Sequence, residues 1–241
     1  FMFGRLVDAA GVDVVLVGDS LGQVVCGYDS TIPVTIEEMI HHARAVRRAV
    51  ERALVVVDMP FMSFQVSREE TVRNAGRILK ETGAEAVKLE GGDEETAAHI
   101  RALVRAGIPV MGHLGLTPQS VHALGGYRVQ GRDAEAAERL RTEASRLEDA
   151  GCFSIVLELV PAVLAGEISR SLQVPTIGIG AGAETDGQVL VLHDMLGLNE
   201  TFRPRFVRRF GELGPAARSA ISDYVAAVRA GQFPTAEHSF E

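Results

Sequence analysis

Short apolar runs alternate with amphipathic stretches along this chain. The runs are nearly continuous in Val, Ile and Leu and cover residues 12–19, 53–60, 86–90, 109–116, 153–158, 175–180 and 188–193. Such runs suit strands that are buried on both faces, which is typical of a parallel sheet. The pattern therefore predicts seven parallel strands.

Helical patterns occupy the segments between these runs. Thr35 and Glu38 have the spacing of a capping box, and apolar residues then recur at helical spacing from Ile36 to Val50. Helical patterns end shortly before a strand at Gly11, Gly83, Gly107 and Gly151. Strands that alternate with helices over short loops favour an open doubly wound sheet or a closed (β/α)8 barrel.

The polar residues favour the barrel, because the predicted strands end in side chains capable of chemistry. These strand-end residues are Asp19, Asp58, Lys88, Glu90, His113 and Glu158. The carboxyl ends of barrel strands converge on one mouth, so these side chains are expected to lie together. One further N-terminal strand would complete eight. We therefore expect residues 1–241 to form a single (β/α)8 domain that is incomplete at its N-terminus.

Charge and composition exclude several classes of protein. The chain has 24 Lys and Arg against 32 Asp and Glu, a net charge of −8. This balance argues against binding to nucleic acid or to an anionic membrane. No segment approaches the roughly 20 apolar residues that span a bilayer. The two cysteines, Cys26 and Cys152, support neither a disulfide framework nor a structural zinc site. A chain without disulfides is typical of a cytoplasmic protein.

Carboxylates crowded at one mouth indicate a metal site. Asp19, Asp58 and Glu90 would repel one another unless a cation lies among them. Oxygen ligands without a Cys or His cluster favour Mg²⁺. The alternative for each acid is a helix cap or a loop residue, and for Lys88 a simple ion pair. His113 is a candidate for direct catalysis or a satisfied buried histidine.

Two glycine-rich segments leave their roles open. Residues 178–182 could bind an anion through backbone amides, or their glycines could allow close backbone approach. Residues 125–131 form a loop long enough to act as a lid, or a solvated connection.

Longer motifs follow one another along nearly the whole chain. They lie at residues 17–22, 27–35, 87–92, 112–120, 125–131, 157–158, 176–182, 186–194 and 233–240. In this order they resemble the 3-methyl-2-oxobutanoate (ketopantoate) hydroxymethyltransferase family. The resemblance implies a (β/α)8 TIM barrel related to the phosphoenolpyruvate mutase and isocitrate lyase group.

The resemblance also implies a reaction. The family transfers a hydroxymethyl group from methylene-tetrahydrofolate to 3-methyl-2-oxobutanoate, giving 2-dehydropantoate for pantothenate and coenzyme A biosynthesis. It implies that Mg²⁺ binds to Asp19, Asp58 and Glu90 and that Glu158 is the base. The residues expected to contact the oxo acid are Asp19, Ser20, Asp58 and Lys88. The family also implies a homo-oligomer, often a decamer.

Two other functions remain compatible with the residues. The first is a Mg²⁺-dependent C–C lyase or mutase of the same barrel group, which would act without folate. The second is a non-catalytic barrel that binds an oxo acid, although such a protein needs no base opposite its ligand.

Overall fold

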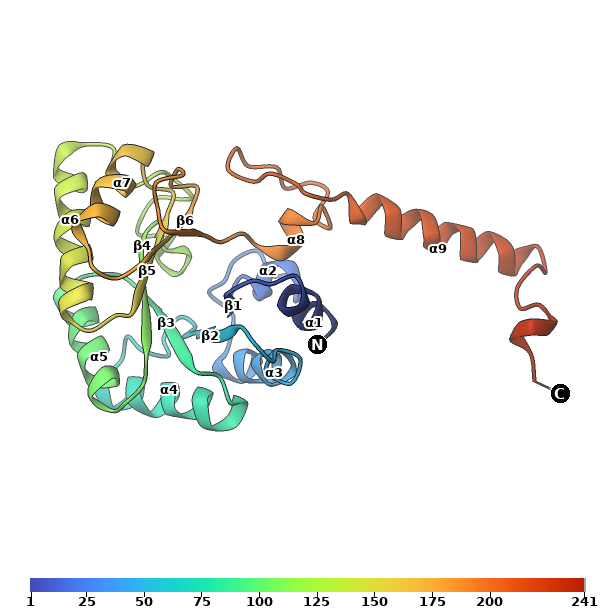
Figure 1. The fold of residues 1–241 in the computed structure, drawn as a ribbon, viewed down its shortest axis with the longest axis horizontal. Helices are drawn as coiled ribbons and strands as arrows, with labels where there is room; N and C mark the ends of the chain where they lie inside the picture. Colours follow the sequence, from blue (N-terminus) through green and yellow to red (C-terminus); the bar gives the residue numbers. More distant parts are fainter. Residues whose placement is uncertain (241) are drawn as a thin grey trace. The chain divides into compact units, whose positions relative to one another are not determined.

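The computed structural model describes residues 1–240, whose strands form one seven-stranded parallel sheet in chain order (Figure 1). The strands are β1 (Val14–Val17), β2 (Leu54–Asp58), β3 (Ala86–Glu90), β4 (Val110–Gly115), β5 (Ser154–Glu158), β6 (Thr176–Ile179) and β7 (Gly187–Gln188). Each strand pairs with the next, and within the described residues β7 does not pair with β1. The fold is therefore a curled, barrel-like α/β sheet that is open between its first and last strands.

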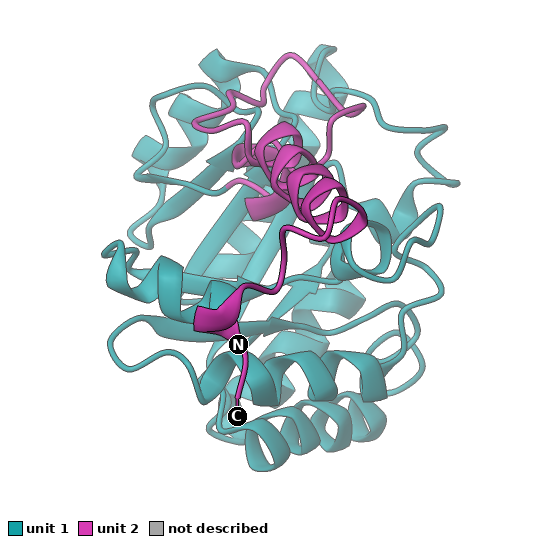
Figure 2. Cartoon of the chain, turned by 90° about the vertical axis from the view of Figure 1, so that its right-hand side faces the viewer, with its two compact units in different colours: residues 1–189 teal, residues 190–241 magenta. Residues whose placement is uncertain are grey.

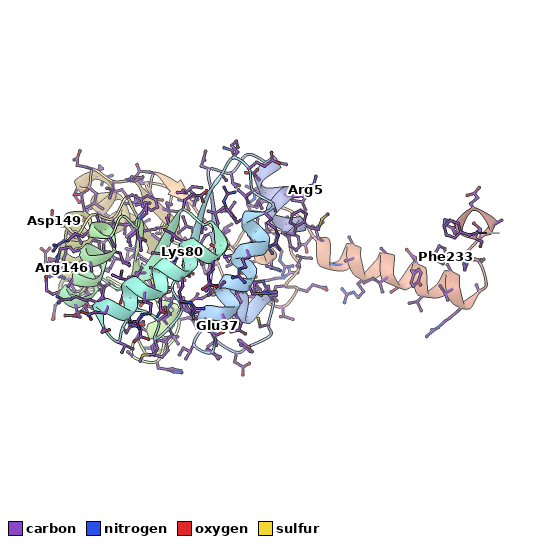
Figure 3. All side chains as sticks on the ribbon, turned by 90° about the horizontal axis from the view of Figure 1, so that it is seen from below. Arg5, Glu37, Lys80, Arg146, Asp149 and Phe233 are labelled. Carbon is purple, nitrogen blue, oxygen red and sulfur yellow. The ribbon has the colours of Figure 1, made fainter. Side chains whose placement is uncertain are left out.

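Helices follow most strands and cover one face of the sheet. The α-helices of residues 1–189 are α1 (Met2–Ala9), α2 (Leu21–Val24), α3 (Ile36–Arg47), α4 (Arg68–Thr82), α5 (Glu94–Arg105), α6 (Ala134–Asp149) and α7 (Ala162–Ser171), with a 3₁₀ turn, η1 (Pro118–Ser120). Neighbours from α3 to α7 contact one another in order. Glu37 on α3 and Lys80 on α4 are exposed (Figure 3). The polar sides of these helices thus face away from the sheet.

Local chemistry explains where these helices begin and end. The Thr35 side chain accepts the amide hydrogen of Glu38, whose carboxylate accepts the Thr35 amide hydrogen, so the predicted capping box is confirmed. Backbone φ is positive at each of the four predicted helix-ending glycines, Gly11, Gly83, Gly107 and Gly151. A residue in the left-handed backbone conformation often ends a helix, and glycine adopts this conformation without steric cost.

The prediction of a strand at residues 188–193 is wrong over most of its length. Strand β7 contains only Gly187 and Gln188, which pair with Ile177 and Gly178 of β6. The chain then enters the short helix α8 (Leu192–Met195). Periodicity alone does not distinguish a short buried strand from a buried helical turn, and the pairing with β6 extends no further.

Alternation along the strands separates a hydrophobic core from a polar face. On one face of β2 and β3 the side chains join the core beneath the helices: Val55, Val57, Val87 and Leu89. Lys88 and Glu90 alternate with these residues and point to the opposite face, although both are buried. The sheet therefore carries chemically active side chains on the face that the helices do not cover.

The chain divides into two compact units, residues 1–189 and residues 190–241 (Figure 2). The second contains α8, α9 (Leu213–Arg229) and the 3₁₀ turn η2 (Ala236–His238), and the rings of Tyr224 and Phe233 meet edge to face within it. The single barrel domain over residues 1–241 stays a prediction. No helix within residues 1–240 is both long and apolar enough to cross a membrane.

We expect Gly115→Ala to destabilise the protein by about 2–4 kcal/mol. Gly115 has φ of +91°, and a Cβ there would lie 2.2 Å from the Glu158 carbonyl oxygen and 2.7 Å from Val160 Cγ2. Urea unfolding followed by circular dichroism measures the change. The matched control is Gly76→Ala in α4, where a Cβ meets nothing within 4 Å, and it should stabilise by about 0.5–1 kcal/mol. Equal stabilities of the two variants would contradict the close approach at Gly115.

Candidate active site

Strand register brings the predicted residues of four strands together. Asp58 at the end of β2 pairs in register with Lys88 on β3, and Glu90 pairs with His113 on β4. Residues in register on parallel strands point to the same face of the sheet. Glu158 is the last residue of β5, next to β4. Five of the predicted strand-end side chains therefore share one face near the carboxyl ends of their strands.

Asp58 contacts residues from the end of β1 and from β3. Its Oδ1 atom lies 2.9 Å from Lys88 Nζ, and both side chains are buried. Its Oδ2 atom accepts the backbone amide hydrogen of Asp19 at 3.0 Å. Burial acts to lower the pKa of Lys88, but the charges of Asp58, Glu90 and Asp19 outweigh it and leave the pKa raised. Lys88 is therefore a cation held among carboxylates.

His113 connects this ion pair to Glu158. Its Nδ1 atom lies 3.1 Å from Lys88 Nζ and 3.3 Å from Glu90 Oε1, and its Nε2 atom lies 3.2 Å from Glu158 Oε2. Burial and Lys88 act to lower the pKa of His113, but the carboxylates of Glu158 and Glu90 leave it raised. Since Lys88 can only donate and Glu90 can only accept, Nδ1 is shared between opposite neighbours. Nε2 is buried without a hydrogen-bond partner among residues 1–240, although Glu158 Oε2 is near.

Gln119 is a site residue that the sequence analysis missed. Its side-chain amide donates to Asp19 Oδ2 and to the Met59 carbonyl, both at 2.9 Å, and its backbone amide donates to Glu90 Oε2 at 3.0 Å. It thus joins the ends of β1, β2 and β3 from the 3₁₀ turn that follows β4. Its place in the motif at residues 112–120 was the only sequence signal, because an amide in a loop carries no charge pattern.

The Asp19 carboxyl group is buried close to two other carboxylates. Burial, followed by the charges of Asp58 and Glu90, raises the pKa of Asp19 to about 8, despite opposing contributions from Lys88 and Gln119. A cation bound beside this carboxylate would relieve that cost. Asp58 Oδ1 is also buried without a hydrogen-bond donor among residues 1–240, although Lys88 Nζ is near.

The three carboxylates do not form a ready three-ligand cluster. Among the described residues, no group of three or more His, Cys, Asp or Glu side chains is arranged to hold a metal ion. Glu90 instead contacts His113 and the Gln119 amide. Mg²⁺ commonly takes one or two carboxylates and leaves its other positions to water and substrate. Asp19 and Asp58 provide oxygen donors of that kind beside excess negative charge, so the residues fit the ion.

The other residues that the sequence singled out are Ser20 and the glycines of residues 178–182. Ser20 is the N-cap residue of the short helix α2 and makes no side-chain capping hydrogen bond. At Gly178 a Cβ would lie 2.6 Å from Thr185 Oγ1, and at Gly182 it would lie 2.4 Å from Ala162 Cβ. These distances favour close approach as the reason for both glycines.

Comparison with proteins of known sequence identifies close relatives. The family model for ketopantoate hydroxymethyltransferase matches residues 1–236. A 3-methyl-2-oxobutanoate hydroxymethyltransferase of Pelobacter propionicus is 58% identical over 240 residues, which cover 100% of this chain and 88% of the relative. The enzyme of the same name from Heliobacterium modesticaldum is 56% identical, with 100% and 87% covered. Identity at this level extends over the whole chain.

Solved structures support the fold independently. A putative phosphonomutase from Burkholderia cenocepacia has a TM-score of 0.58 at 17% identity, covering 95% of this chain and 89% of that one. A 2,3-dimethylmalate lyase of the phosphoenolpyruvate mutase and isocitrate lyase superfamily has a TM-score of 0.57 at 18% identity, covering 98% and 82%. The predicted fold class is therefore confirmed. The family model, which matches residues 1–236, and relatives that are 56–58% identical over the whole chain show that it belongs to the ketopantoate hydroxymethyltransferase family.

Proposed function

We propose that this protein transfers a hydroxymethyl group to 3-methyl-2-oxobutanoate, giving 2-dehydropantoate for pantothenate and coenzyme A biosynthesis. The one-carbon donor is methylene-tetrahydrofolate, and the metal is Mg²⁺. The observation that carries the proposal is the constellation of Asp19, Asp58, Lys88 and Glu158 at the ends of neighbouring strands, in a chain that belongs to this family. This set offers metal ligands, a buried cation and a base.

The proposed metal ligands are Asp19 and Asp58, with Glu90 adding negative charge nearby or ligating directly. Bound Mg²⁺ would act as a Lewis acid that polarises the keto group of the oxo acid, an effect worth several kcal/mol. Ser20 follows Asp19 in the sequence and is proposed to contact the oxo acid. Lys88, which lies 2.9 Å from Asp58 Oδ1, is proposed to balance the charge that develops on the substrate.

Glu158 is the proposed base that takes the C3 proton of the oxo acid. Its carboxylate is partly exposed while its neighbours are buried, so a substrate at the strand ends can reach it. His113, whose Nε2 atom lies 3.2 Å from Glu158 Oε2, is proposed to position this carboxylate. Once the proton is on Glu158, C3 of the oxo acid forms a bond to the one-carbon unit of the donor. Both C–N bonds that held this carbon break, water supplies the oxygen of the new hydroxyl group, and tetrahydrofolate leaves.

Homo-oligomerisation and a cytoplasmic location stay predictions. Helix α1 exposes apolar side chains, with Met2 67% and Leu6 60% exposed. Faces of this kind are typical of protein interfaces when they form a contiguous patch. Light scattering of the purified protein would measure the number of subunits.

Omitting either Mg²⁺ or methylene-tetrahydrofolate should abolish formation of 2-dehydropantoate from 3-methyl-2-oxobutanoate. The expected loss follows because the donor supplies the transferred carbon and the metal polarises the acceptor. Product analysis by mass spectrometry is the measurement. Cleavage of an oxaloacetate-like acid without folate would support the lyase alternative, and oxo-acid binding without any turnover would support the non-catalytic one.

A further inference from the structure

A hollow of about 490 Å³ lies between two loops at the carboxyl ends of the strands. One wall is the loop after β1, and the other is the loop after β4 and η1. It is lined by Asp29, Ser30, Val121, His122, Gly125, Gly126 and Tyr127. We call this hollow the loop pocket. It joins the motifs at residues 27–35 and 125–131, which the acid–base chemistry above leaves without a role.

The two walls of the loop pocket are tied to the active site. The Gln119 side chain donates to Asp19 Oδ2 across one hundred residues of sequence, and Asp19 begins the first loop while Gln119 begins the second. Along the second loop, the Val121 amide bonds to the Pro118 carbonyl and the Gly126 amide to the Val121 carbonyl. The hydrogen bond from Gln119 to Asp19 therefore joins the two segments that continue into the walls of the pocket.

The lining offers three kinds of contact that no described residue uses. The Asp29 carboxylate has no hydrogen bond or ion pair within residues 1–240, and the Tyr127 ring is 54% exposed. Gly125 and Gly126 both have positive φ, and a Cβ on either would meet nothing within 4 Å. A free carboxylate, an open aromatic face and bare backbone thus line one hollow.

We propose that the loop pocket binds the reduced pterin ring of the one-carbon donor, an inference that rests on the proposed function. The aminopyrimidinone edge of a pterin presents two parallel N–H donors, and a carboxylate such as Asp29 accepts both in bidentate geometry. The planar pyrimidinone part of the pterin stacks on Tyr127, and the glycines let it approach the backbone closely. A volume of about 490 Å³ lies within the range of ligand sites.

A second hollow provides the matched control. It measures about 430 Å³ and is lined by Pro33, Phe61, Met62 and Glu70, among others, from the loops after β1 and β2 and from α4. It also has a carboxylate and an aromatic ring. The Asn74 side-chain amide in its lining, however, already donates to the Ser63 carbonyl.

The test compares Asp29→Asn, Tyr127→Ala and Tyr127→Phe with the control Glu70→Gln. Steady-state kinetics are measured with methylene-tetrahydrofolate varied at saturating oxo acid, and then with the oxo acid varied. We expect Asp29→Asn and Tyr127→Ala to raise the KM for the donor by about tenfold or more, with the KM for the oxo acid unchanged. Tyr127→Phe keeps the ring and should stay close to the unmodified protein, as should Glu70→Gln.

A second measurement separates this inference from the proposed function. Exchange of the oxo-acid C3 proton into heavy water needs Mg²⁺ and Glu158 but no donor, so the pocket variants should exchange at the rate of the unmodified protein. If the unmodified protein neither exchanges nor transfers, the proposed function fails. If it does both, an unchanged donor KM in the pocket variants, a raised oxo-acid KM, or a raised donor KM in Glu70→Gln overturns the pterin assignment.

Discussion

Glu158→Gln should abolish exchange of the C3 proton of 3-methyl-2-oxobutanoate into heavy water and lower kcat for product formation by at least about a hundredfold. The amide keeps the shape of the side chain but cannot accept a proton at neutral pH. Binding of Mg²⁺ and of the oxo acid should persist, because the proposed contacts to both lie on Asp19, Asp58 and Lys88. Proton NMR follows the exchange, and calorimetry measures the binding.

The matched control for this substitution is Glu167→Gln. Glu167 lies on α7, is exposed, and forms an ion pair with Arg141 on the outer surface. Exchange and turnover should be unchanged in this variant. Exchange at the unmodified rate in Glu158→Gln would remove Glu158 as the base and leave His113, its 3.2 Å neighbour, as the next candidate.

Lys88→Met should lower the free energy of unfolding by about 3–5 kcal/mol, because it leaves the buried carboxylate of Asp58 without its cation. The raised pKa of Lys88 means that this side chain holds its proton more tightly in the folded protein than in the unfolded chain. Its contribution to stability is therefore complete below the unfolded pKa of about 10.5 and is lost only as pH rises through the higher folded value. The full loss is expected at pH 7, measured by urea unfolding.

The pH dependence and a second variant make this prediction specific. At acidic pH, where the partner carboxylates take up protons, the difference between Lys88→Met and the unmodified protein should shrink. The double variant Asp58→Asn with Lys88→Met should recover part of the stability. Lys80→Met on the exposed side of α4 is the control and should change stability by less than about 0.5 kcal/mol. Equal losses in both lysine variants would contradict a buried charge network.

Most of the strands and most residues of the candidate site could be predicted because their signals are local. A strand buried on both faces needs a continuous apolar run, so the charged residue that ends it stands out, as Asp58 and Glu158 do. Gln119 had no such signal, because its role arises from hydrogen bonds to residues far away in the sequence. The prediction of a strand at residues 188–193 was wrong for a related reason. Their apolar pattern fits a strand or a helical turn, and only the limited pairing with β6 decides between them.

By itself the sequence determined the alternation of buried strands and capped helices, the parallel sheet and the identity of the groups at the strand ends, since propensity, periodicity and capping act over a few residues. Only the tertiary structure decided which of those groups meet. The register of β2 with β3 sets Lys88 against Asp58, and that of β3 with β4 sets Glu90 against His113. Register depends on contacts between segments distant along the chain, and a shift by one residue would turn these side chains to the opposite face.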